Sequence, residues 1–574
     1  MRPTVKGKRP VNILYGADET PPLSSALPVV LQQVIFLSLD LVFPVIVVAT
    51  IMSSSLLAQS VVSLTMLAMG IGTIMQALHK GSVGSGYFCP QETGVLYLPA
   101  SLIAVQTGGF SLMLGMTALA GLAEVAFAKI IHKVRFMFPT EIAGLVVVMI
   151  GFMLIPISVG LVCGSTPQGG PVDTKAMTLG FMTLGLIVML SVWGKGSLRQ
   201  YAIVIGILFG YGAAYSMGIL TDENLSHVSQ APLFALPDIS HIGWSFDSGL
   251  IIPFLVAAIG SAIKTVGNVT VCQKADNAEW KRPDMRSVEG GLIADGLSTM
   301  VAGLIGGMGQ NSSSGGVGLN VATGVISRVI GFFVGTAFLV IAFMPKVSAL
   351  FTIMPKPVIG AMLIISAIFV LITGFQIIMS RMLDTRKTFI IGLALVFGIS
   401  VDILPSLYQN VSGDMKALFA SSFSLATVIA IVANLVFRLG VKQSRTIETE
   451  PSAVTADSIF DFLEGAGASW GARQEVIARA IAVVIEFMES AAALELVEGK
   501  AKVTAAFDEF NLNIDVYYRG REMEFPFSRP TPQELLEDNC AFIRLSGYMI
   551  RQHADKVQSD SNNGLHHVQF HFEH

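Results

Sequence analysis

Residues Gly306-Gly-Met-Gly-Gln-Asn-Ser-Ser-Ser-Gly-Gly-Val-Gly318 interrupt a part of the chain that is otherwise apolar. A second stretch, Gly81-Ser-Val-Gly-Ser-Gly-Tyr-Phe-Cys-Pro90, has the same character. Each is rich in glycine and serine, and each runs into an apolar half-helix without a charged flank. Extended backbone inside a membrane is tolerated only where protein or a cavity satisfies its amides. We interpret both stretches as broken membrane segments; the alternative is an exposed loop or small-residue helix packing.

The composition is that of a membrane protein. Of the 574 residues, 52% are hydrophobic and 13% are charged, and the mean hydropathy is +0.67. A soluble chain carries about 25% charged residues, which cover its water-facing surface. The net charge of -4 comes with no basic face, so the sequence predicts no nucleic-acid partner. Neither the cysteines nor the histidines have metal-ligand or nucleophile spacing, so we expect no cofactor and no enzyme.

Apolar runs of about 20 residues, the length that crosses the hydrocarbon core, follow one another along most of the chain. We place spans at 25–51, 57–79, 109–131, 137–162, 175–194, 200–219, 248–272, 286–307, 324–344, 356–379, 387–404 and 422–439. Two further segments, 83–107 and 408–421, are interrupted or short. The prediction is an all-α polytopic membrane protein of about fourteen transmembrane segments, with short strands in segments 3 and 10. Broken segments at matching places in two halves indicate the midplane solute site of a transporter.

The basic residues orient the chain. Lys and Arg follow the even-numbered spans, whereas the 220–247 loop carries acidic residues and no Lys or Arg. By the positive-inside rule, we predict a multi-pass protein of the cell inner (plasma) membrane with cytoplasmic N- and C-termini. The first apolar segment has no small-residue cleavage site, so we expect a retained span. Arg381, Arg386 and Lys387 would lie outside under this count, so either a span near 380–421 is miscounted or their loop is an exception.

The chain changes character near residue 440. We assign 1–440 to the transmembrane domain, 441–456 to a polar linker and 457–574 to a small cytoplasmic α/β domain. Hydrophobic periodicity in the last part predicts a helix at 472–491, strands at 502–508 and 512–518, a helix at 532–556 and a strand at 565–572.

Five motifs in one order resemble a known family. They are Leu31-Gln32-Gln33, Phe138 to Pro156, Gly291-Leu-Ile-Ala-Asp-Gly-Leu297 with Ala302-Gly-Leu-Ile-Gly306, the set Gly318, Thr323, Gly324, Ser327 and Arg328, and Met354-Pro-Lys-Pro-Val-Ile-Gly360. Over about residues 20–440 the chain resembles the nucleobase–ascorbate transporter (xanthine/uracil permease, nucleobase:cation symporter-2) family.

The resemblance implies seven-plus-seven inverted repeats and elevator-type alternating access. Core spans 1–4 and 8–11 would carry a nucleobase-like solute such as xanthine, urate or uracil against gate spans 5–7 and 12–14. We also expect coupling to H⁺ or Na⁺ and a homodimer in the lipid bilayer. Independently of the family, the N-termini of two half-helices present unpaired N–H groups that suit carbonyl oxygens or an anionic ring.

The sequence departs from the family at the site itself. The family usually holds the nucleobase with an eighth-span carboxylate, in a Glu-x-x-Gly-Asp pattern, whereas this chain has Lys264 and Asn268 at those two places. It also lacks the tenth-span Gln-Asn or Glu-Asn pair. The first-span amides and the third-segment aromatic residues are also candidate contacts, although they could serve only helix packing. In total we predict substrate contacts at Gln32, Gln33, Tyr87, Phe88, Lys264, Asn268, Gly315, Gly316, Val317 and Gly318.

Lys264 has three open interpretations. It could contact substrate, and an ammonium, which only donates hydrogen bonds, would favour an acidic solute such as urate. It could pair with Asp295, which lies within an apolar helix, or reach the interface. Asp295 is otherwise a candidate proton or cation relay, so we predict coupling or an ion pair at Asp295 and Lys264.

Two alternatives concern the whole protein. The C-terminal order of elements resembles a histidine-kinase-like ATPase domain, but Ser490 stands in place of the Mg²⁺-binding Asn, so we expect a degenerate, non-catalytic domain. A membrane-bound sensor with this domain as its output is therefore one alternative. The other is an anion transporter of the same architecture, similar to the sulfate permeases, which Lys264 favours.

Overall fold

The structure, a computed structural model, divides into two compact units. The first contains Met1–Phe138, Ile142–Phe375 and Ala394–Ile429, and the second contains Pro139–Glu141, Gln376–Leu393 and Ala430–His574. The residues that the structure describes are 10–11, 13–50, 55–78, 81–134, 139–164, 171–195, 198, 201–278, 280, 283–379, 382–408, 419, 421–437, 444–451, 455–507, 511–531, 541–562 and 564–573.

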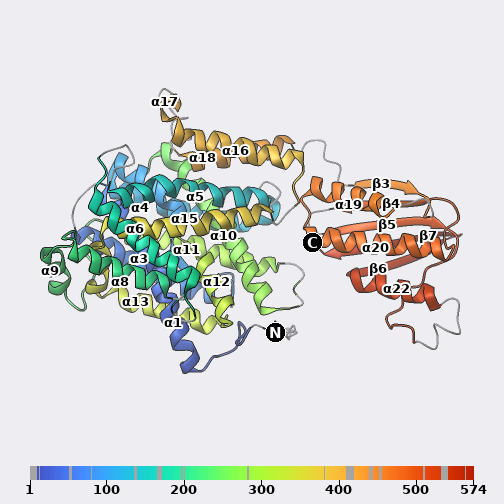
Figure 1. The fold of residues 1–574 in the computed structure, drawn as a ribbon, viewed down its shortest axis with the longest axis horizontal. Coiled ribbons are helices and arrows are strands. Elements are labelled where there is room, and N and C mark those ends of the chain that lie inside the picture. The colour runs from blue at the N-terminus through green and yellow to red at the C-terminus, as the bar shows by residue number, and fades with distance from the viewer. Residues whose placement is uncertain are drawn as a thin grey trace. The chain divides into compact units, whose positions relative to one another are not determined.

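Helices lie at the predicted spans (Figure 1). They are α1 (Leu23–Ser38), η1 (Leu39–Leu41), α2 (Val42–Ala49), α3 (Ser55–Ala77), α4 (Leu98–Val134), α5 (Thr140–Cys163), α6 (Thr174–Trp193), α8 (Ala202–Ser216), α9 (Asp222–Gln230), α10 (Ile251–Asp276), α11 (Met285–Ile305), α12 (Ser314–Thr323), α13 (Arg328–Ala342), α14 (Pro345–Thr352), α15 (Lys356–Met379), α16 (Thr385–Ile403), α17 (Pro405–Tyr408) and α18 (Ser422–Phe437). In the described part, eight helical segments are long and apolar enough to cross a membrane, and the bent pair α13–α14 would make a ninth. The polytopic, mostly helical membrane fold is therefore confirmed. The predicted segment 408–421 falls almost entirely outside the described residues.

The two glycine-rich stretches meet. Each leads into a short strand, β1 (Gln91–Thr93) or β2 (Gln310–Ser312), and the two strands pair antiparallel. The Ser313 amide donates to the Pro90 carbonyl at 2.8 Å, which extends the pairing by one step. Each strand is followed by a helix, η2 (Val95–Tyr97) leading to α4 in one case and α12 in the other. The predicted strands in segments 3 and 10 thus exist and cross-link the two halves of the chain.

Local chemistry explains why the chain breaks before α12. Helix α11 ends at Gly306, whose φ of 96° is a left-handed conformation that an L side chain rarely adopts. Ser313 caps the start of helix α12, and its Oγ accepts a hydrogen bond from the Gly316 amide. The intervening strand pairs with β1, which provides hydrogen-bond partners for extended backbone at this depth.

Close contact between α4 and α11 forms the centre of the first unit. A Cβ on Gly121 would lie 2.5 Å from the Gly296 carbonyl oxygen, and a Cβ on Gly296 would lie 2.8 Å from that of Gly121. Helices in lipid associate where small residues let their backbones approach, and these two glycines provide such an approach.

The second unit contains a five-stranded antiparallel sheet in the order β3-β4-β5-β7-β6 (orange to red in Figure 1). Its strands are β3 (Ser444–Thr449), β4 (Ala501–Phe507), β5 (Asn511–Arg519), β6 (Lys556–Asn562) and β7 (Leu565–Glu573), and its helices are α19 (Ala456–Trp470), α20 (Gln474–Ala493) and α22 (Ala541–His553). Inward side chains of the sheet and of these helices share one core. Its members include Val484, Phe487, Ile514 and Phe570.

The sequence predicted five of these elements, one of them only in part, and missed three. The predicted linker 441–456 is wrong in part, because β3 pairs with β4 along its whole length and so belongs to the sheet. Helix α19 and strand β6 were not predicted. The first part of the predicted helix 532–556 lies outside the described residues, and its later part is α22.

The second unit also includes the beginnings of α5 and α16. Glu141, at the start of α5, forms an ion pair with Lys387, at the start of α16. The Met382 amide, in the loop before α16, donates to the Ala472 carbonyl just after α19. Glu141 and Lys387 also lie against Gly471, where a Cβ would be 2.8 Å from a Glu141 carboxylate oxygen. These contacts lie within the second unit, between the residues just after α19 and the first residues of α5 and α16.

Candidate functional site

An ion pair lies beside the crossing of β1 and β2. The Lys264 ammonium, from α10, donates to the Glu92 carboxylate of β1 at 2.5 Å and to Asn311 Oδ1 of β2 at 3.2 Å. Glu92 and Asn311 are direct partners in the strand register, so one ammonium bridges both strands. The two charged side chains are only 15% and 11% exposed. The interpretation that paired Lys264 with Asp295 is wrong, because Lys264 pairs with Glu92.

A second carboxylate faces this pair. Asp40 lies in η1, the short 3-10 turn that interrupts the first span, and it interacts with both Glu92 and Lys264. Four elements, η1, β1, α10 and β2, thus contribute polar side chains to one place. Our sequence analysis missed Asp40, Glu92 and Asn311. An acidic residue within an apolar span is itself an indication of function, and that signal could have identified the two carboxylates.

Asn268 holds the strand β2 in place. Its Nδ2 donates to the Ser312 carbonyl at 3.1 Å and lies 2.8 Å from Ser312 Oγ. Thr265, one turn earlier on α10, lies 2.7 Å from the same hydroxyl. The predicted substrate ligand Asn268 therefore uses its amide donor within the protein, and the structure supports a positioning role for it.

The first-span amides behave in the same way. Gln33 Nε2 donates to the Gly316 carbonyl at 2.9 Å and to Asn320 Oδ1 at 2.5 Å. Asn320 Nδ2 in turn donates to the Phe88 carbonyl at 3.0 Å. This network ties α1, α12 and the stretch before β1 together. Gln32 is also buried, at 9% exposure.

Three of the predicted contact residues pack in apolar cores. The Phe88 ring is 2% exposed and belongs to the core between α1, α3 and α13. Val317, also 2% exposed, and the partly buried Tyr87 belong to a second core with Phe127 of α4. Phe88 and Val317 therefore pack in these cores, and their contact with a solute stays a prediction.

The glycines of α12 differ in their surroundings. A Cβ on Gly315 would lie 2.5 Å from the Phe36 ring, and one on Gly316 would lie 2.7 Å from Pro90. Gly318 is exposed, with no described atom within 4 Å of where its Cβ would be. Gly315 therefore permits the close approach of α12 to α1, and Gly316 permits that of the two broken segments, whereas Gly318 lies on the open side of the helix.

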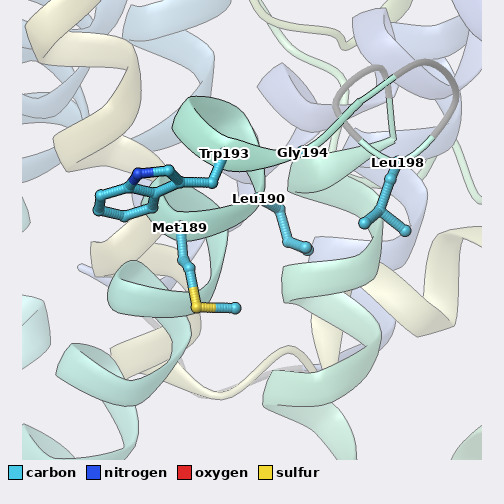
Figure 2. Close-up of a pocket in the computed structure, with 5 residues that line it drawn as sticks. All are labelled: Met189, Leu190, Trp193, Gly194 and Leu198. Carbon is cyan, nitrogen blue, oxygen red and sulfur yellow. The ribbon is translucent and has the colours of Figure 1, made fainter.

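An apolar pocket lies elsewhere, at the end of α6. It measures about 390 Å³, and its lining residues are Met189, Leu190, Trp193, Gly194 and Leu198 (Figure 2). Trp193 is 73% exposed at the last position of its helix. Tryptophan is enriched at the membrane–water interface, so this place suits an interfacial anchor. None of the predicted site residues lines the pocket.

Comparison with known proteins identifies the family. The family model Xan_ur_permease, described as "Permease family", matches residues 25–407. The xanthine permease XanP of Escherichia coli (strain K12) is 25% identical over 442 residues, which cover 74% of this chain and 94% of XanP. The uric acid permease PucK of Bacillus subtilis (strain 168) is 27% identical over 386 residues, which cover 66% and 87%. Among solved structures, that of the murine anion transporter Slc26a9 in the inward-facing state is similar with a TM-score of 0.49 and 10% identity, over 75% of this chain and 71% of that one. Because the family model matches well over half of its length, the chain belongs to this family of membrane permeases.

Proposed function

We propose that the protein is a secondary active transporter of a nucleobase-like solute such as xanthine, urate or uracil. The observation that carries the proposal is the crossing of β1 and β2, with Lys264, Glu92 and Asn311 beside it. The relatives XanP and PucK are a xanthine and a uric acid permease, which supports this solute class. The sulfate-permease-like alternative is not favoured, since Lys264, its main support, is neutralised by Glu92.

The ion pair suits the edge of a nucleobase. Such an edge alternates N–H donors with carbonyl acceptors. A carboxylate accepts from N–H groups and an ammonium donates to carbonyls, so Glu92 and Lys264 together match the alternation. In this proposal Glu92 supplies, from the third segment, the carboxylate that the family usually has in the eighth span. Lys264 alone would imply a preference for an acidic solute. Because Glu92 balances its charge, this preference no longer follows.

Counterflow tests the proposed solute class. The full chain would be reconstituted into proteoliposomes and preloaded in turn with xanthine, urate, uracil or sulfate. We expect rapid exchange of at least one labelled nucleobase-like solute and none of sulfate, which offers no N–H edge to Glu92. Exchange of sulfate alone would refute the proposal. Empty liposomes and a panel with adenosine, which is too large for a base-sized site, provide the controls.

The seven-plus-seven arrangement belongs to the same proposal. An ion pair joins groups on one side of a bilayer, so Glu141–Lys387 supports placing the starts of α5 and α16 on the same side. If β2 and α12 form the tenth span, the chain crosses the membrane an even number of times between the start of α5 and the start of α16, which returns it to the same side. The basic loop at Arg386 then lies inside, and 408–421 is not needed as a span. Core spans 1–4 and 8–11, gate spans 5–7 and 12–14, elevator-type movement and cytoplasmic termini complete the proposed mechanism.

Cysteine labelling checks this topology. In a background with the native cysteines replaced, Thr385→Cys and Lys129→Cys should both resist a membrane-impermeant maleimide in intact cells. Asp238→Cys, in the opposite loop, should react. All three positions are exposed on the protein surface, so only the side of the membrane decides which cysteine is labelled. Labelling of both Thr385→Cys and Asp238→Cys would place their loops on the same side of the membrane. That result would contradict the assignment of β2 and α12 as the tenth span.

The remaining proposals concern assembly and the second unit. We infer a regulatory, non-catalytic role for the sheet domain, and we retain the kinase-like ancestry as part of that proposal. Its support is the packing of Ala472 and Gly471 against the ends of α5 and α16, since such contacts can transmit a change between the domain and those helices. A homodimer stays a prediction.

A further inference from the structure

The segment 231–247, which we call the connecting loop, lies shortly before α10 and contains neither helix nor strand. Two backbone hydrogen bonds nevertheless hold it in place. The Ala235 amide donates to the Phe343 carbonyl at 3.1 Å. The Ser245 amide donates to the Ser111 carbonyl at 2.9 Å. A loop that is held near both of its ends has a defined place in the fold.

Side chains of the connecting loop also bind the end of α11. Trp244 Nε1 donates to the Gly303 carbonyl at 3.1 Å. His241 Nε2 lies 3.4 Å from the carbonyl oxygen of Gly306, the residue that ends α11. The His241 ring also meets the Phe110 ring edge-on, with 6.1 Å between their centroids. The loop is therefore fixed to α11 and α4 as well as by its own backbone.

These contacts place the loop at the ends of membrane segments. Gly303 lies in the last turn of Met285–Ile305, which is long and apolar enough to cross a membrane, and Phe343 directly follows α13. The loop itself runs into a further candidate span, Ser248–Asp276. Helices that cross the hydrocarbon core end where the headgroup region begins. The connecting loop should therefore lie at the boundary between lipid and water.

Six large apolar side chains of the loop are each more than half exposed, although the loop is held firmly. We call them the apolar rim: Leu233, Phe234, Leu236, Ile239, Trp244 and Phe246. Leu236 is the most open of them, at 84% exposure. Apolar surface in contact with water is unfavourable roughly in proportion to its area. Exposed apolar groups gathered in one short segment are typical of a surface that another molecule or a membrane covers.

The charges of the loop limit the kind of partner. It contains Asp238 and Asp247 but no Lys or Arg. Asp238 accepts hydrogen bonds from the Ser240 amide at 2.9 Å and from the Ser240 hydroxyl at 2.8 Å, so its carboxylate stabilises a turn. Anionic lipid headgroups are attracted by clusters of Lys and Arg, which this segment lacks. The partner must therefore be bound through apolar contact.

The apolar rim continues into the exposed side of α10. Ile251, Ile252 and Leu255, in the first turns of this helix, are also exposed. Because α10 belongs to a segment that can cross a membrane, lipid is what covers such side chains. Phe246 lies five positions before Ile251, so the same lipid surface reaches the rim. Tryptophan, present at Trp244, is typical of this level of the bilayer.

We propose that the connecting loop is an interfacial anchor, whose apolar rim inserts between the lipid headgroups and the upper acyl chains. It binds by apolar contact and does not distinguish anionic from zwitterionic headgroups. The loop joins the predicted spans seven and eight, which the proposed mechanism assigns to the gate and the core. The anchor therefore keeps the link between gate and core at one depth in the bilayer. This inference does not depend on which solute is transported.

Spin labelling of the reconstituted full chain tests the anchor. In the background with the native cysteines replaced, a nitroxide is attached to Leu236→Cys or, as the matched control, to Glu223→Cys. Glu223 is exposed on α9, in the same stretch between spans. Collision rates with oxygen, which dissolves in lipid, and with a water-soluble nickel chelate are then compared. We expect a several-fold higher ratio of oxygen to nickel collisions at position 236, equal in phosphatidylcholine vesicles with and without phosphatidylglycerol.

Three results would overturn the proposal. Equal ratios at positions 236 and 223 would place the apolar rim in water. Low collision rates with both reagents at position 236, together with spin–spin broadening that disappears on dilution in lipid, would mean that a second copy covers the rim. A high ratio found only with phosphatidylglycerol would show that headgroup charge determines the contact. If Leu236→Cys does not elute as a single species, Ile239→Cys, another rim position, takes its place with the same expectation.

Discussion

Lys264→Glu should abolish solute uptake. The substitution removes the only described cation that faces Glu92 and Asp40, and it adds a third carboxylate at less than one-fifth exposure. Breaking a buried ion pair by removal of one partner costs about 3–5 kcal/mol. If that cost falls on the transport-competent arrangement of β1 and β2, uptake should decrease by about a hundred-fold or more, since 1.4 kcal/mol corresponds to a factor of ten. Initial rates of counterflow, normalised to folded protein, measure the effect.

The exchanged pair distinguishes an ion pair from a simple need for lysine. Glu92→Lys combined with Lys264→Glu restores opposite charges across the same gap, so uptake should recover at least about ten-fold over the single variant if the pair itself matters. The matched control exchanges Lys129 and Glu289, a pair 57% and 28% exposed, which should cost less than about 1 kcal/mol. Unchanged uptake and solute preference in Lys264→Glu would mean that the pair has no part in the site.

Gly84→Ala should destabilise the first unit severely. Gly84 has a φ of 97°, and a Cβ there would lie 2.3 Å from the Leu78 carbonyl oxygen and 2.5 Å from that of Met75. The left-handed conformation costs an L residue about 1–2 kcal/mol, and overpacking against fixed backbone adds about 1–3 kcal/mol. The Gly84 amide also donates to the Gly290 carbonyl at 2.9 Å, so a shift would disturb α11 as well.

Gly81→Ala is the control within the same stretch. Gly81 has nearly the same φ, 94°, but no described atom lies within 4 Å of its Cβ position. This variant should carry only the conformational cost, about 1–2 kcal/mol. Size-exclusion chromatography of detergent-solubilised protein after graded heating measures both. Equal thermal stability of the two variants would show that the close approach at Gly84 is not what holds the break in place.

Some of the site could be read from the chain and some could not. The glycine-rich interruptions predicted the two strands because extended backbone in a membrane needs a partner, and each stretch could provide one for the other. The individual ligands were harder to predict. Asn268 and Gln33 lie near the crossing, but their amides hold Ser312 and Asn320. Which polar group faces a solute and which holds a strand depends on distances that the sequence does not contain.

The charged groups illustrate the same division. Lys264 was identified as an unusual cation in an apolar helix, and its charge requires a partner there. The sequence offered Asp295 because it is close in the chain, whereas the partner is Glu92, 172 positions away. Only the pairing of β1 with β2 brings Glu92 to α10. The proposed tenth span could not be assigned from the sequence for a related reason, since α12 is too short to be recognised as a span by length alone.

The sequence by itself determined the class of the molecule: composition and apolar run length require a bilayer, and periodicity in the last part of the chain requires a small mixed domain. Local hydrophobicity and backbone preference are properties of short segments, so a reader of the chain can evaluate them. The tertiary structure alone decided which charges compensate one another, which helices hold the connecting loop, and that β3 completes the sheet. These outcomes depend on contacts between residues far apart in the chain, where desolvation and Coulomb energy act over a few ångströms of space rather than along the sequence.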